Sequence, residues 1–275
     1  MISLIFAIIC SALVSLFMKL SSKYVQNEMI MFASNYFICF ILAIITNQNA
    51  TVFEFHSITI ILGIISGILY LASFMLMKFN MNINGVVYTS IFMKLGVLIP
   101  TLSAIFIFKE QIQCLKILGI ALSLIAILIF YYEKDHHFQG NKIYLLLLLI
   151  GGGLGDAMAQ FFDQFGKLSL ESLYLFMTFF IAFLCACAYA LIKKERFNVK
   201  DFMIGTCIAI PNFGSSKFLL QALTKLDAVF VYPMYSVTTL VVIALFGVIL
   251  FKEKLNKWKI LAIFLVIVAI WLLNC

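Results

Sequence analysis

The sequence predicts an all-α integral membrane protein with ten transmembrane helices, built as two inverted five-helix repeats. Three observations support this fold class: the composition, the spacing of apolar segments and a correspondence between the two halves. Of the 275 residues, 64% are hydrophobic and 11% are charged, whereas soluble domains have about 45–50% and about 25%. A water-soluble fold could not bury so much apolar surface, so we expect that surface to face lipid.

Ten apolar segments have a length that suits a membrane crossing, which needs about 20 predominantly apolar residues. They are 2–22, 29–46, 57–79, 84–107, 114–132, 143–165, 172–192, 201–223, 228–251 and 258–274. The connections are short and leave no room for an extramembrane domain. The first segment lacks a basic leader and a small-residue cleavage site, so we expect a membrane helix rather than a signal peptide.

The two halves correspond when the chain is shifted against itself by 143 residues. Phe108-Lys109-Glu110 then falls on Phe251-Lys252-Glu253, and Lys116-Ile117-Leu118 falls on Lys259-Ile260-Leu261. We therefore predict one repeat at 1–133 and a second at 142–275. Because each holds an odd number of helices, the second enters the membrane upside down. Inverted repeats of this kind place a substrate site near the bilayer midplane in transporters.

These halves, each ending with a long helix, an apolar residue plus Lys-Glu and a last helix, resemble the EamA group of the drug/metabolite transporter (DMT) superfamily. The resemblance covers nearly the whole chain. It implies a cavity lined by the first, third, fourth, sixth, eighth and ninth helices. It also implies secondary transport of metabolites, often amino acids or drugs and often outward. We expect the Lys109-Glu110 and Lys252-Glu253 pairs to be structural, as caps or salt bridges.

Two ionisable residues lie deep within apolar segments. An ionised side chain at the bilayer centre costs about 2.5–3.5 kcal/mol on insertion scales, so such residues mark candidate sites. Asp156 lies mid-span in 143–165, with Gln160 one turn further on, and Lys94 lies in the middle of 84–107. We expect Asp156 to bind a cationic group or a proton and Lys94 to face a substrate anion. A static Lys94–Asp156 ion pair is the alternative.

Neutral polar and aromatic side chains complete the predicted substrate site, because aromatic walls with a few polar tips suit a small organic solute. These residues are Tyr70, Asn212, Tyr232, Tyr235 and Ser236. Two structural alternatives stay open: Asn212 can form an interhelical hydrogen bond, and the tyrosines can form an interfacial belt. Pro211, beside Asn212, is expected to act as a hinge or kink.

The expected function is secondary transport, as an exporter, of a small metabolite by alternating access around a central cavity. Opposite charges in the site suit an amino acid or another zwitterion. A hydrophobic drug or cation exporter, a lipid-linked flippase and a channel are the alternatives. The sequence has no Walker A loop and no HExxH motif, so neither an ATPase nor an embedded enzyme is expected.

The expected partners are the small-molecule substrate and the lipid bilayer, with a coupling proton as an option. No cofactor, metal or nucleic acid is expected, since the seven cysteines form no CxxC pair and the net charge of +7 is spread over short loops. We expect Asp135-His136-His137 to be a solvated loop. Two complete halves suggest a monomer, as a multi-pass protein of the plasma or inner membrane.

The first testable prediction concerns orientation. Loops after odd-numbered segments carry twelve Lys or Arg residues and loops after even-numbered segments carry four, which predicts that both termini lie outside the cytosol. The family resemblance instead implies cytosolic termini. A reporter that works only in the cytosol should be inactive after Cys275 and active after Lys194. Activity after Cys275 would overturn the orientation derived from charge.

Overall fold

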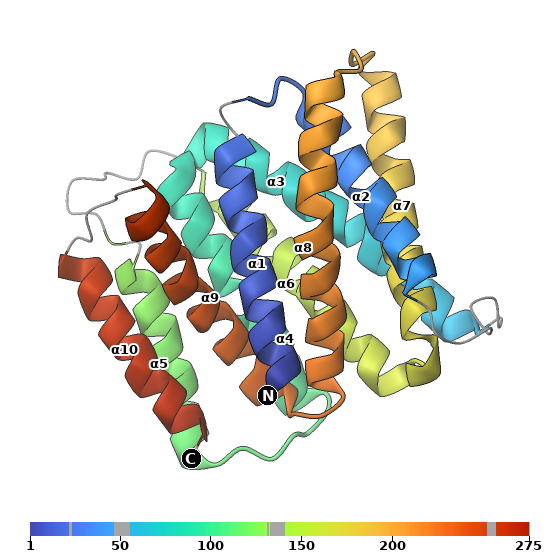
Figure 1. The fold of residues 1–275 in the computed structure, drawn as a ribbon. Coiled ribbons are helices and arrows are strands. Elements are labelled where there is room, and N and C mark those ends of the chain that lie inside the picture. Colours follow the sequence, from blue (N-terminus) through green and yellow to red (C-terminus); the bar gives the residue numbers. More distant parts are fainter. Residues whose placement is uncertain (22–23, 47–55, 131, 133–140, 252–256, 275) are drawn as a thin grey trace. The chain divides into compact units, whose positions relative to one another are not determined.

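The computed structural model describes residues 1–21, 24–46, 56–130, 132, 141–251 and 257–274, where the regular structure is helical (Figure 1). The helices are α1 (Ile2–Ser21), α2 (Glu28–Ile45), α3 (Ser57–Leu95), α4 (Leu98–Phe106), α5 (Cys114–Phe130), α6 (Lys142–Phe165), the short 3-10 helix η1 (Leu168–Leu170), α7 (Glu171–Ile192), α8 (Val199–Leu223), α9 (Ala228–Phe251) and α10 (Lys257–Asn274).

Seven segments of the described chain are long and apolar enough to cross a membrane. They comprise α1, α2, α6, α9, η1 with α7, and two parts of the α3–α4 region, Ser57–Met81 and Tyr88–Phe106. α5 is apolar but has only 17 residues, and α8 carries Lys200, Asp201 and Lys217. Large apolar side chains are exposed, among them Phe106 at 74% and Trp271 at 65%. This apolar surface suits contact with lipid. Ten membrane crossings were predicted, and the three beyond these seven remain a prediction.

The chain folds as two compact units. Unit 1 comprises Met1–Leu71 and Met158–Thr224, and unit 2 comprises Ala72–Ala157 and Lys225–Cys275. Each unit therefore combines helices from both halves of the sequence, and α3 and α6 contribute to both units. The compact units do not coincide with the predicted repeats 1–133 and 142–275, which remain a prediction about sequence ancestry.

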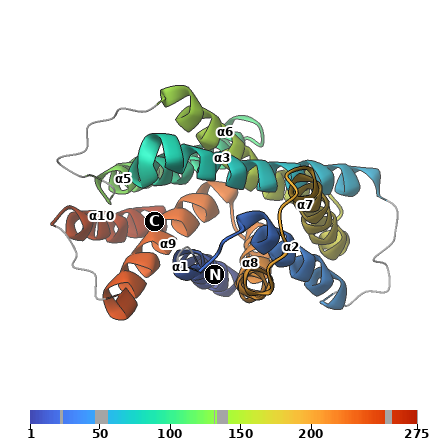
Figure 2. The same ribbon diagram turned by 90° about the horizontal axis from the view of Figure 1, so that it is seen from above.

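In unit 1, α2 packs against both α7 and α8, and α1 lies along α8 (Figures 1 and 2). α8 approaches α2 closely at Gly205, where any Cβ would overlap Ser34 Oγ and the Met31 carbonyl oxygen. The N-terminus of α2 is capped by Asn27, whose side chain accepts hydrogen bonds from the backbone N–H groups of Met29 and Ile30. Polar residues at the helix ends thus fix where the apolar helices begin.

In unit 2, α5 packs along α10 and α4 packs against α9 (Figure 1). The carboxylate of Glu110 accepts hydrogen bonds from the N–H groups of Ala228 at 3.2 Å and Val229 at 2.9 Å. Glu110 therefore caps the positive N-terminal end of α9, which agrees with the structural role expected of the first Lys-Glu pair. The second pair, Lys252-Glu253, lies outside the described residues.

Three of the packed helix pairs are related in the same way. α2 contacts α7, α4 contacts α9 and α5 contacts α10, so each pair joins a helix with the helix five places later. A chain built from two five-helix repeats related by twofold pseudosymmetry would pair its helices in this manner.

The α3 region differs from the prediction of separate helices at 57–79 and 84–107. α3 is continuous over 39 residues, to Leu95. The intervening asparagines do not end it, because Asn80 donates a hydrogen bond to the Leu76 carbonyl at 2.9 Å and Asn84 donates one to Asn80 Oδ1 at 2.6 Å. Their polar groups are thereby satisfied along the helix itself.

The helix ends instead inside the predicted segment 84–107, at Gly96-Val97. Pro100 explains this position, since a proline cannot donate to the carbonyl four residues earlier, at Gly96, and its ring crowds that carbonyl. Lys94 therefore lies in the last turn of α3 rather than in the middle of a helix, and the prediction for its position was wrong.

Candidate functional site

Two glycines bring the deep charges of unit 2 to the same place. A Cβ on Gly96 would lie 3.1 Å from the backbone nitrogen of Gly153 on α6, so the two backbones are nearly in contact. Lys94 precedes this crossing by two residues and Asp156 follows it by three. The charges of Lys94 and Asp156 are close enough to interact electrostatically. The local backbone thus brings together two charges that lie far apart in sequence.

The two charged groups do not contact each other directly. Asp156 is exposed and Lys94 is half-buried, and among the described residues their charged atoms form no salt bridge within 4.0 Å. The neighbouring face of α6 is open, since no other side chain lies within 4 Å of where a Cβ on Gly152 would stand. An exposed carboxylate in the middle of a membrane-spanning helix needs water or a polar ligand beside it.

α9 supports the backbone of α6 at this point. The hydroxyl group of Tyr232 donates a hydrogen bond of 2.8 Å to the backbone carbonyl of Asp156, and Tyr232 is only 1% exposed. Tyr232 therefore holds the backbone of Asp156 in place. Tyr235 is half-buried and Ser236 is buried, on the same helix.

The other predicted site residues, Tyr70, Gln160 and Asn212, belong to unit 1. Asn212 on α8 donates a hydrogen bond of 3.3 Å to Asn35 Oδ1 on α2, which is the interhelical bond named as its alternative role. The Tyr70 hydroxyl lies 3.5 Å from Ser216 Oγ. Gln160 is 1% exposed. The eight predicted residues therefore form two separate sets, five in unit 2 and three in unit 1.

A small cavity in unit 1 is lined by Tyr70 and by several residues that were not predicted to form a site. Its volume is about 10 Å³, and it is lined by Ser66, Tyr70, Ala159, Tyr174, Leu175, Thr178, Ser216, Leu219 and Leu220. The Tyr174 hydroxyl donates to Ser66 Oγ at 3.1 Å. The spacing of Tyr174 and Thr178, one helical turn apart on α7, was the available sequence signal.

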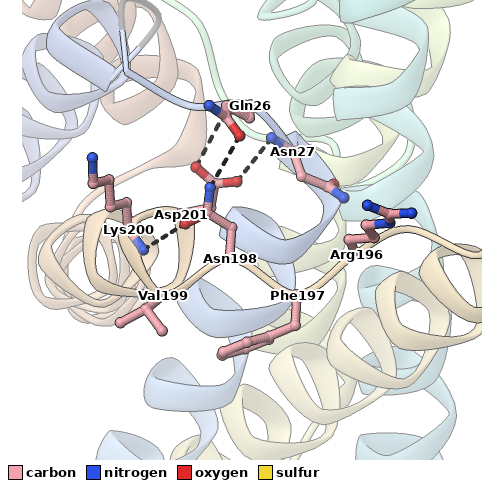
Figure 3. Close-up of a pocket in the computed structure, with 8 residues that line it drawn as sticks. All are labelled: Gln26, Asn27, Arg196, Phe197, Asn198, Val199, Lys200 and Asp201. Carbon is pink, nitrogen blue, oxygen red and sulfur yellow. Dashed lines mark hydrogen bonds between the residues drawn. The ribbon is translucent and has the colours of Figure 1, made fainter.

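A larger pocket of about 530 Å³ lies where the loops before α2 and α8 meet in unit 1 (Figure 3). Its centre is Asp201, which is 0% exposed and whose carboxylate accepts the N–H groups of Gln26 at 3.2 Å and Asn27 at 2.9 Å. Lys200 and Arg196 lie on opposite sides of this contact (Figure 3). Both carboxylate oxygens are used to hold the loop, so we assign Asp201 a structural role.

No group of three or more His, Cys, Asp or Glu residues suited to a metal ion occurs in the part of the chain that the structure describes. Asp135-His136-His137 lies outside that part.

Comparison with known proteins points to one family in the second half of the chain. The model of the EamA-like transporter family matches residues 143–275. An uncharacterised protein of Haemophilus influenzae is 24% identical over 293 aligned positions, which cover 98% of this chain and 97% of that protein. A solved crystal structure with 12% sequence identity superposes with a TM-score of 0.80, covering 98% of this chain and 94% of the other, which shows a shared fold. The resemblance to this family inferred from the sequence is confirmed for residues 143–275, and the apolar helices mark the chain as a multi-pass membrane protein.

The close approach of Gly96 and Gly153 can be tested by adding one methyl group. In Gly153→Ala the new Cβ would overlap the Gly96 carbonyl oxygen and the Ile99 side chain, so we expect a loss of about 1–3 kcal/mol in stability, as for overpacked cores. Gly152→Ala is the matched control, because its Cβ would meet open space. Thermal unfolding of both variants in detergent measures the difference. Equal unfolding temperatures would refute the close approach.

Proposed function

We propose that this chain is a secondary transporter exporting a small zwitterionic metabolite, such as an amino acid, a proposal supported by the match of residues 143–275 to the EamA-like transporter family of the DMT superfamily. The cell membrane is the proposed location. The observation that carries the substrate class is the Lys94–Asp156 arrangement in unit 2. A zwitterion offers a carboxylate to the ammonium group of Lys94 and an ammonium group to the carboxylate of Asp156.

The geometry of the two charges supports a ligand between them rather than a closed ion pair. Their charges interact but no salt bridge within 4.0 Å joins them among the described residues. The open face at Gly152 lies one turn from Asp156. A ligand bearing both charges would satisfy both residues at once, which lowers the cost of keeping them within the membrane span.

The helix arrangement supports alternating access as the mechanism. The pairing of α2 with α7, α4 with α9 and α5 with α10 fits a twofold-related design in which the two repeats rock around a midplane site. Pro211 within α8 and Pro233 within α9 each remove a backbone hydrogen bond. These are points where a helix bends at lower cost.

A hydrophobic cation exporter is the second candidate. Asp156 is exposed whereas Lys94 is half-buried, and the partly exposed Tyr235 adds an aromatic face that attracts cations. In that case Asp156 alone would recognise the substrate, and Lys94 would be dispensable for binding.

A thermal-shift screen of the purified protein separates these candidates. We expect one or more of the twenty L-amino acids to stabilise the protein, by about 2.7 kcal/mol at 100 times the dissociation constant. Lys94→Ala should abolish that stabilisation. Stabilisation by tetraphenylphosphonium that survives Lys94→Ala would instead support the cation exporter. No stabilisation by any amino acid would contradict the zwitterion proposal.

Replacing the proposed ligand carboxylate tests the site directly. Asp156→Asn keeps the shape of the side chain and its backbone bond to Tyr232, but removes the charge that binds a substrate ammonium group. We expect uptake into proteoliposomes to fall at least about tenfold, equivalent to about 1.4 kcal/mol, with an unchanged elution profile in detergent. Asp163→Asn, on the last turns of the same helix, should transport normally. Normal uptake by Asp156→Asn would exclude Asp156 from the site.

A further inference from the structure

Unit 1 contains a second acidic group that the proposed substrate site does not use. Glu171 is the first residue of α7, and its Oε1 atom is buried without a hydrogen-bond partner among the described residues. A buried carboxylate oxygen without a donor is unfavourable by several kcal/mol when it is charged. The side chain is therefore set up either to take a proton or to pair with a cation.

A cation whose charge acts on Glu171 is Lys217 on α8. Within the described residues, however, the two charged groups form no salt bridge within 4.0 Å. The ammonium nitrogen of Lys217 instead lies 5.9 Å from the centre of the Phe213 ring, a distance at which a cation is attracted to an aromatic face. The charge of Lys217 thus interacts with two groups, the Phe213 ring and the Glu171 carboxylate.

The face of α7 that carries Glu171 also lines the small cavity. Tyr174, Leu175 and Thr178 line that cavity and follow Glu171 by three, four and seven residues, which puts them on the same helical face. The lining hydroxyl groups are already linked in pairs, Tyr174 to Ser66 at 3.1 Å and Tyr70 to Ser216 at 3.5 Å. A volume of about 10 Å³ holds about one water molecule.

Other charged or titratable groups around the start of α7 come from two places in the described chain. The end of α6 and its connection carry Asp163 and Lys167, and His56 precedes α3, where its ring lies 2.9 Å from Thr59 Oγ1. The last turn of α2, which packs on α7 through Phe40 and Phe176, carries none. The group whose charge acts on Glu171 is Lys217.

We propose that Glu171 is the site of the coupling proton, with Lys217 as its exchange partner, and this rests on the proposed transport function. A proton from water on one side of the membrane binds the carboxylate and neutralises it, and Lys217 rests on Phe213. When the proton leaves to water on the other side, Lys217 moves to the ionised carboxylate. The hydroxyl groups and one water molecule in the cavity provide hydrogen-bonded steps for the proton.

The chain offers a matched control for this residue. Glu28 is the first residue of α2, as Glu171 is of α7, and the two are 143 residues apart, which is the repeat spacing. Both residues lie at the N-terminus of a helix, where the helix dipole stabilises a negative charge. A purely structural role for an acidic first residue would therefore affect Glu28→Gln and Glu171→Gln alike.

The first experiment needs no substrate. The full chain in phosphatidylcholine liposomes is titrated by infrared difference spectroscopy, which follows the carbonyl band of a protonated carboxyl group. We expect one such band to vanish in Glu171→Gln and to persist in Glu28→Gln. Lys217→Met, which retains Glu171, should move the band to a higher pH because a neighbouring positive charge is lost. An unchanged spectrum in Glu171→Gln, or an unmoved band in Lys217→Met, would overturn the proposal.

The second experiment measures coupling. Proteoliposomes are given a radiolabelled mixture of the twenty L-amino acids, with and without a pH gradient of one unit, which supports at most about tenfold accumulation for one proton per substrate. Glu171→Gln should lose this accumulation and keep exchange of internal for external amino acid, whereas Glu28→Gln keeps both. Accumulation by Glu171→Gln at the wild-type level would refute the proposal.

The two proposals can fail independently. If the wild-type protein moves no amino acid but the infrared band still depends on Glu171, the zwitterion substrate is wrong and the proton site is supported. If amino acids exchange but the band and the accumulation do not depend on Glu171, the substrate proposal stands and the proton site is wrong.

Discussion

The lack of water inside a bilayer is the constraint on which the rest of this structure depends. A polar group within the hydrocarbon must find its partner in the protein, and a helix satisfies its own backbone. Side chains along the spans follow the same rule: Ser123 and Thr178 each donate to the carbonyl four residues earlier, and Asn212 donates to Asn35 across two helices. These neutral polar residues thereby have hydrogen-bond partners within the protein.

Two acidic groups that escape this rule are the ones to which we assign function. Asp156 is exposed in mid-span, next to an open helix face, and Glu171 has a buried oxygen without a donor in the described chain. Each has a lysine near enough to interact but not joined to it by a salt bridge. An acid and a base held apart in this way can respond to a third charge, a substrate in one unit and a proton in the other.

Close backbone contact is the second determinant of the site. α8 meets α2 at Gly205, and α6 meets the end of α3 at Gly153 and Gly96. Helices in lipid gain little from the hydrophobic effect between them, so small residues that permit close packing have a larger share in their association. Pro100 ends α3 just before Gly96, and Gly96 and Gly153 let α6 approach closely at that point. These two local features together bring Lys94 near Asp156.

The sequence by itself determined that this is a helical membrane protein. The lipid bilayer requires apolar side chains and sets the length of each spanning segment, so both features are visible in the sequence. The sequence also indicated the family, and Lys94 and Asp156 as deep charges, since an ionisable residue in an apolar run is visible without a structure. The tertiary structure decided the rest. It continued α3 past Asn80 and Asn84 and ended it before Pro100, it gave Asn212 and Tyr232 structural partners, and it brought Lys217 near enough for its charge to act on Glu171. These contacts join residues distant in the chain, and apolar helices have too little sequence pattern to specify which faces meet.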